Sequence, residues 1–83
     1  MTAVFETWYD DRKPEERQQA RSRVEDARDW LARIGIGAEI EDDPPYVDEE
    51  GTYLLGPSGR FWVKVPDADV VRSRELLEGC EAG

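Results

Sequence analysis

The apolar positions of the chain follow two periods, and each period indicates a different kind of element. Ala3 to Tyr9 is rich in β-branched and aromatic residues and is followed by two aspartates, which predicts a first strand that ends in a turn. From Pro14 to Ile34 the apolar residues recur at steps of four, three, four and three, the spacing of one buried stripe on a helix. We expect Gly35 to end this helix in a left-handed conformation, with Ile36 folding back onto the last turn.

Three more strands and a second helix are expected in the rest of the chain. Residues 36–40 alternate apolar side chains with glycine and glutamate, as in a strand with one buried face. Residues 52–55 and 61–65 flank a Gly-Pro-Ser-Gly turn, which predicts a hairpin that leaves Trp62 on the outward face. Asp67 can cap a shorter helix. The order β-α-β-β-β-α favours an α+β two-layer sandwich, with a mostly antiparallel sheet and two helices on one face.

The length and composition of the chain indicate one domain over residues 1–83. A chain of 83 residues supports a single core, and 39% hydrophobic residues, with three Trp, three Tyr and two Phe, are enough to form it. The lone Cys80 cannot form an internal disulfide, and we interpret it as a small apolar residue of the second helix. No apolar run is long enough for a membrane span, and the N-terminus lacks the basic start of a signal peptide. The sequence therefore predicts a cytoplasmic protein.

The charge of the chain is strongly negative and unevenly distributed. A net charge of −9 repels nucleic-acid phosphates and anionic lipids, so we expect neither direct nucleic-acid binding nor membrane binding. The first predicted helix carries five acidic and five basic residues and is neutral overall. Ile36 to Gly59, by contrast, holds seven acidic residues and no lysine or arginine. The sequence therefore predicts that the unpaired negative charge is concentrated in this segment.

Residues for catalysis or for cofactor binding are scarce. The chain has no histidine and one cysteine, so the common nucleophile arrangements and zinc sites cannot be built. Neither a Gly-x-Gly-x-x-Gly run nor a Walker-type Gly-Lys-Ser/Thr run is present. We therefore expect a protein that is not an enzyme and that needs no cofactor and no metal.

Three interpretations of the acidic segment are open. Its carboxylates can keep a strand edge from pairing with other chains. Grouped carboxylates also suit Ca²⁺ or Mg²⁺, but the spacing over residues 42–51 does not match an EF-hand loop. The third interpretation is a surface that docks on a basic protein groove, with aromatic anchors inside a charged rim. The partner-binding residues predicted for that surface are Glu39, Glu41, Asp42, Asp43, Tyr46, Asp48, Glu49, Glu50, Tyr53 and Trp62.

Two stretches of the sequence carry a family resemblance. They are Trp30 to Ala38, which reads Trp-Leu-Ala-Arg-Ile-Gly-Ile-Gly-Ala, and Phe61 to Asp69, which is followed by Arg74 to Leu77. Here the chain resembles a group of small bacterial signal-transducing proteins with a PII-like α+β fold. The resemblance implies the same fold and a role in sensing a small ligand or a partner, and it supplies no catalytic residues.

A second similarity is one of composition. In its size, its acidity and its lack of catalytic residues, the chain is similar to the DNA-mimic inhibitors carried by phages, which include many anti-CRISPR proteins. The leading hypothesis is a non-enzymatic inhibitor or regulator, a monomer or weak dimer, that occupies the basic surface of a nucleic-acid-binding partner. The alternative is a PII-like signalling domain, whose ligand would be found by a thermal-shift screen against nucleotides and metals.

Overall fold

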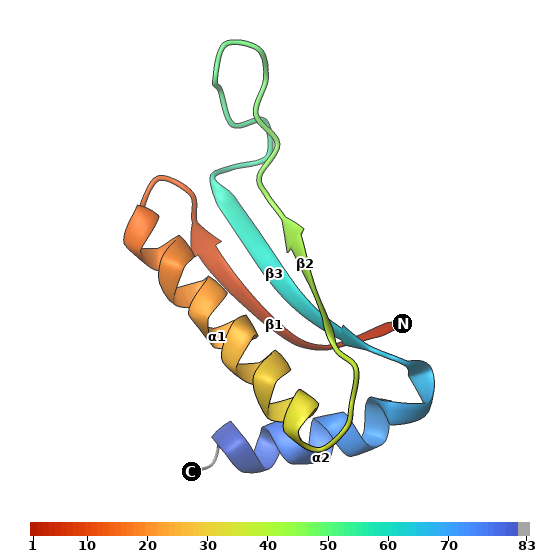
Figure 1. Cartoon of the computed structure of the whole chain (residues 1–83). Helices are drawn as coiled ribbons and strands as arrows, with labels where there is room; N and C mark the ends of the chain where they lie inside the picture. Colours follow the sequence, from red (N-terminus) through yellow and green to blue (C-terminus); the bar gives the residue numbers. More distant parts are fainter. Residues whose placement is uncertain (82–83) are drawn as a thin grey trace.

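The chain folds into a three-stranded sheet and two helices. The computed structural model describes the backbone of residues 1–81 and the side-chain surroundings of residues 1–78, so the interpretation of Cys80 lies outside the described side chains. The elements in chain order are β1 (Thr2–Asp10), α1 (Pro14–Arg33), β2 (Glu39–Asp43), β3 (Ser58–Val65), a short 3-10 turn (Asp67–Asp69) and α2 (Val70–Glu81). The strands form one antiparallel sheet with β3 in the centre, in the order β1-β3-β2 (Figure 1). The predicted α+β class is confirmed.

Helix α1 begins and ends as the sequence predicts. Pro14 occupies the first turn, where its missing N–H costs no hydrogen bond. At the other end Gly35 has a φ of 84°, and the N–H of Ile36 donates to the Leu31 carbonyl oxygen at 3.0 Å. This is the Schellman cap expected from the sequence, and it buries Ile36 against the core. No helix within residues 1–81 is long and apolar enough to cross a membrane.

One face of the sheet carries the core. Along β3, Phe61 and Val63 are buried and alternate with partly exposed residues, as expected for a strand with one covered face. Val24 and Leu31 of α1 and Leu77 of α2 belong to the same buried cluster. Both helices therefore cover the same face of the sheet, as predicted, and the described residues place no helix on the opposite face.

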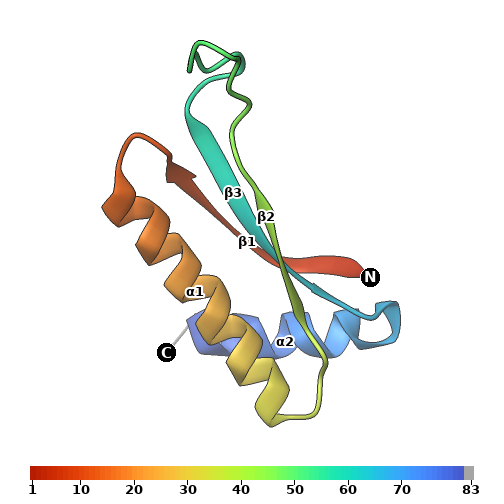
Figure 2. The same cartoon turned by 45° about the horizontal axis from the view of Figure 1, so that its top comes forward.

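The strand expected over residues 52–55 is wrong, and so is the hairpin built on it. Within that segment the only β contact is an isolated bridge between Val47 and Tyr53. β3 pairs with β2 instead, and residues 44–57 between them form a loop that extends beyond the end of the sheet (Figures 1 and 2). We call residues 44–57 the arm. Residues 52–54 pair instead with residues 46–48 of the arm, where the Leu54 N–H donates to the Tyr46 carbonyl oxygen at 3.1 Å and the Asp48 N–H donates to the Thr52 carbonyl oxygen at 3.0 Å. This pairing is too short to form a strand.

Strand β2 is shifted along the chain relative to the prediction over residues 36–40. It begins at Glu39 because Ile36 is used in the α1 cap. It continues to Asp43 and ends at the two prolines that follow, since proline cannot donate to a strand ladder. The consequence is a strand made largely of acidic residues at one edge of the sheet.

Candidate protein-binding surfaces

The arm has a defined turn at its tip. One carboxylate oxygen of Asp48 accepts hydrogen bonds from the backbone N–H groups of Glu50, at 2.9 Å, and of Thr52, at 2.8 Å. The N–H of Gly51 donates to the Asp48 carbonyl oxygen at 3.1 Å, and its φ of 83° suits glycine. Asp48, one of the predicted contact residues, therefore shapes the turn.

The base of the arm is tied to the end of β1. The Tyr53 hydroxyl donates to the Asp11 carboxylate at 2.9 Å, and this hydrogen bond raises the pKa of Tyr53. The N–H of Asp11 also donates to the Pro57 carbonyl oxygen at 2.9 Å. Tyr53, predicted as an aromatic anchor for a partner, thus holds the arm in place.

The surface of the arm combines apolar and acidic side chains. Leu55 is 86% exposed and Tyr46 is 71% exposed, and Val47 and Leu54 are exposed as well. Glu49 and Glu50 are exposed at the tip. Exposed apolar side chains that gather on one segment commonly mark interaction sites. Tyr46 was predicted to be a contact residue. The sequence prediction missed the two leucines because it placed them in a strand.

Three of the predicted contact residues form ion pairs with bases from other elements. The pairs are Glu41 with Lys64, Asp42 with Arg17 at 3.3 Å, and Asp43 with Arg60 at 3.2 Å. The prediction that the charge of residues 36–59 is unpaired is wrong for these three, because the compensating bases come from α1 and β3. The other four acidic residues of this segment, Glu39, Asp48, Glu49 and Glu50, form no ion pair among the described residues, so the uncompensated charge of the segment is on the arm and at the start of β2.

Asp42 lies on the helix side of the sheet, opposite Phe61 in the strand register. Besides Arg17, it accepts a hydrogen bond from the Tyr9 hydroxyl at 3.3 Å. Burial, and then the neighbouring Asp42 carboxylate, raise the pKa of Tyr9. Asp42 therefore links β1, α1 and β2, which is a structural role.

On the open face of the sheet, the side chain of Arg60 contacts two aromatic rings. The Arg60 guanidinium lies 4.6 Å from the Trp8 ring centroid and 4.0 Å from that of Trp62. Glu6 pairs with Arg60 at 3.6 Å and accepts a hydrogen bond from the Trp62 indole at 3.1 Å. The outward position of Trp62 is confirmed, although its ring is engaged by its own neighbours. Trp8 was missed, and at 57% exposed it is the more accessible ring.

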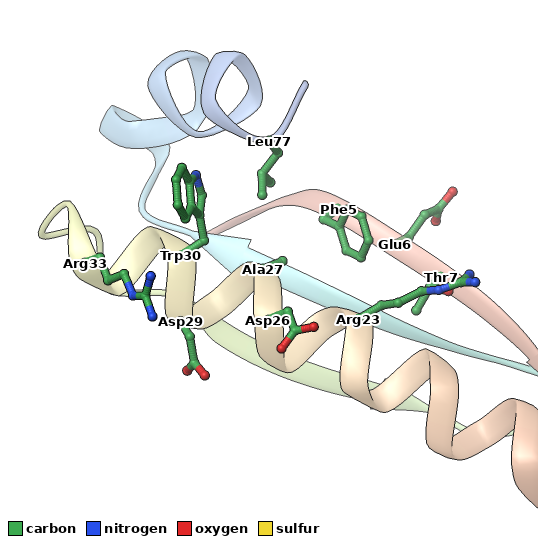
Figure 3. Close-up of a pocket in the computed structure, with 10 residues that line it drawn as sticks. All are labelled: Phe5, Glu6, Thr7, Arg23, Asp26, Ala27, Asp29, Trp30, Arg33 and Leu77. Carbon is green, nitrogen blue, oxygen red and sulfur yellow. The ribbon is translucent and has the colours of Figure 1, made fainter. Parts of the chain in front are cut away.

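A groove lies between the two helices at the edge of β1. Its volume is about 660 Å³, and its floor includes Phe5, Ala27, Trp30 and Leu77 (Figure 3). Glu6 and Thr7 of β1 and four charged residues of α1 also line it, and the latter are Arg23, Asp26, Asp29 and Arg33. Within the residues that the structure describes, no group of three or more histidine, cysteine, aspartate or glutamate side chains is placed to hold a metal ion.

Comparison with known proteins gave no relative. The chain matches no protein-family model, no curated protein and no solved structure. The candidate surfaces therefore rest on their own geometry.

Proposed function

We propose that this chain is a non-enzymatic inhibitor or regulator that uses the arm to dock on a basic, nucleic-acid-binding surface of a partner protein. The observation that carries the proposal is the arm itself. It presents Leu54, Leu55 and Tyr46 to solvent beside the carboxylates of Glu49 and Glu50, on a loop whose turn and base are fixed by hydrogen bonds.

The apolar side chains supply the affinity in this proposal. Burying a leucine removes apolar surface from water and contributes about 1.5–3 kcal/mol when burial is complete. Interfaces draw most of their binding energy from a few such buried anchors, surrounded by polar contacts that exclude water. A loop that is already ordered also loses less conformational entropy on binding than a flexible one.

The carboxylates favour a partner with a positively charged surface. Glu49 and Glu50 belong to a chain with a net charge of −9, and this negative charge attracts a basic groove and accelerates encounter with it. Basic grooves commonly serve nucleic-acid phosphates, and carboxylates can take the positions of phosphates there. Occupation by this chain would then compete with DNA or RNA.

The test first captures a partner protein from a lysate and then asks whether the chain competes with nucleic acid for that partner. The tagged chain is used as bait in a host lysate at about 0.1 M and about 0.5 M NaCl, because screening weakens contacts between exposed charges. We expect the captured protein to bind DNA or RNA, to be released at the higher salt, and to lose its oligonucleotide when the chain is added in excess.

Matched variants assign the binding to the arm. Leu54→Ser/Leu55→Ser and Glu49→Gln/Glu50→Gln are each expected to weaken binding to the captured protein by about tenfold or more. Glu75→Gln/Glu78→Gln makes the same charge change on exposed residues of α2 and should leave binding unchanged. Equal affinity of the arm variants and the α2 variant, or a captured protein that binds no nucleic acid, would contradict the proposal.

A further inference from the structure

The two edges of the sheet differ in how they are protected. β2, at one edge, has acidic residues at four of its five positions. Charges on an edge strand prevent another chain from adding to it. β1, at the other edge, is longer and has charged residues only at Glu6 and Asp10, and after a register shift between Ala3 and Phe5 it runs regularly from Phe5. The β1 edge is therefore the one that is open to another strand.

The groove follows this open edge. Phe5, Glu6 and Thr7 are consecutive in β1 and all line it, although Glu6 has its side chain on the opposite face of the sheet. The groove therefore reaches the backbone of the edge strand. A strand added beside β1 would place alternate side chains in it, against Trp30 and Leu77 (Figure 3).

The charges along the groove have both signs. Arg23, Arg33 and Asp26 of α1 line it and are exposed, and none of the ion pairs within the described residues includes them. Neighbouring charges of the same helix are paired, such as Arg21 with Glu25 at 3.0 Å. A patch that carries uncompensated charges of both signs is complementary to a copy of itself, because a two-fold axis places each sign opposite the other.

We propose that a second copy of this chain occupies the groove, with its β1 paired antiparallel to the first β1 across a two-fold axis. The two three-stranded sheets then form one continuous sheet of six strands, and the helices of both copies lie on the same side. Arg23 of each copy meets Asp26 of the other. An interface of standard size buries about 800 Å² per partner, which is roughly a seventh of the 5768 Å² accessible surface of this chain. We expect the groove walls to contribute to this buried area together with the paired strands.

Charge-reversal variants test this pairing. Sedimentation velocity of the full chain, from about 1 µM to about 0.5 mM, is expected to show a monomer that converts to a dimer. Arg23→Glu and Asp26→Arg each create like charges across the axis, and each is expected to raise the dissociation constant by about tenfold or more. An equimolar mixture of the two variants restores opposite charges at both contacts and should form a heterodimer. Both residues are exposed on α1, so the fold is expected to survive, and circular dichroism checks this.

Three outcomes would overturn the proposal: a monomer over the whole concentration range, a dimer that neither variant weakens, or a variant mixture that stays monomeric. A monomer would leave the groove available for a small ligand. Amide exchange gives an independent check, because the backbone of residues 5–8 should become more protected as the dimer forms. The arm variant Leu54→Ser/Leu55→Ser should dimerise normally, so failure of the dimer and failure of the proposed function can be told apart.

Discussion

At the scale of single residues, Tyr9 and Gly59 depend on each other. The Tyr9 ring is buried, lies 5.1 Å from the Phe61 ring centroid and occupies the space that a Cβ at Gly59 would need. Its hydroxyl reaches Asp42, which also pairs with Arg17. A residue opposite Tyr9 in the strand register must therefore be glycine for the ring to cover the core.

We predict that Gly59→Ala destabilises the fold by about 1–3 kcal/mol, because the buried ring cannot move away from the added methyl group without disturbing the core. Urea unfolding followed by tryptophan fluorescence measures the change. Gly37→Ala is the matched control, since an added Cβ there has nothing within 4 Å, and it should be neutral or slightly stabilising. A Gly59→Ala protein as stable as the control would show that the ring adapts.

At the scale of elements, the sequence predicted what is set by local pattern. Helix α1 was predicted almost to the residue, because Pro14, the apolar period and Gly35 all specify the same boundaries. β3 was predicted with its correct buried face, since one side of the strand is covered and the other is not. In both cases the residues that predict the feature lie within a few positions of it along the chain.

Features that depend on distant contacts were predicted poorly. The strand over residues 52–55 had the right propensity, but β3, its expected partner, pairs with β1 and β2 instead. Asp42 was expected to be free, and its partner Arg17 lies 25 positions away along the chain. The distribution of charged residues along the sequence correctly located the excess of acidic over basic residues. Only the folded chain shows which of these acidic residues are neutralised by an ion pair.

The arm is predicted to behave as a local unit. Asp48→Ala removes the acceptor for the N–H groups of Glu50 and Thr52, so amide exchange at these two positions should become faster. The free energy of unfolding should change by no more than about 0.5 kcal/mol, because the arm extends away from the core (Figure 2). Glu49→Ala, which changes the charge equally and removes none of these bonds, should leave exchange unchanged. Similar exchange in both variants would mean that Asp48 does not hold the turn.

At the scale of the whole molecule, both ends of β1 are held by carboxylates. At one end, hydrogen bonds from the Arg12 side chain, joined by one from its backbone N–H, lower the pKa of Asp10 from 3.8 to about 2. At the other end, a hydrogen bond from the Thr2 hydroxyl at 2.6 Å and the nearby N-terminal amino group lower the pKa of Asp67. The unfolded chain binds protons to these groups at higher pH than the folded chain does.

Stability should therefore fall in acid. A carboxyl with a lowered pKa in the folded state stabilises the fold above its unfolded pKa, and this contribution is lost as the pH falls from about 4 towards 2. We predict that Asp10→Asn is less stable than the native chain at pH 6 and that the difference disappears near pH 2, as measured by urea unfolding. Glu49→Gln makes the same charge change on the exposed arm and is the control variant. If the difference for Asp10→Asn does not change with pH, its hydrogen bonds stabilise the end of β1 through geometry alone, and the charge of Asp10 contributes nothing.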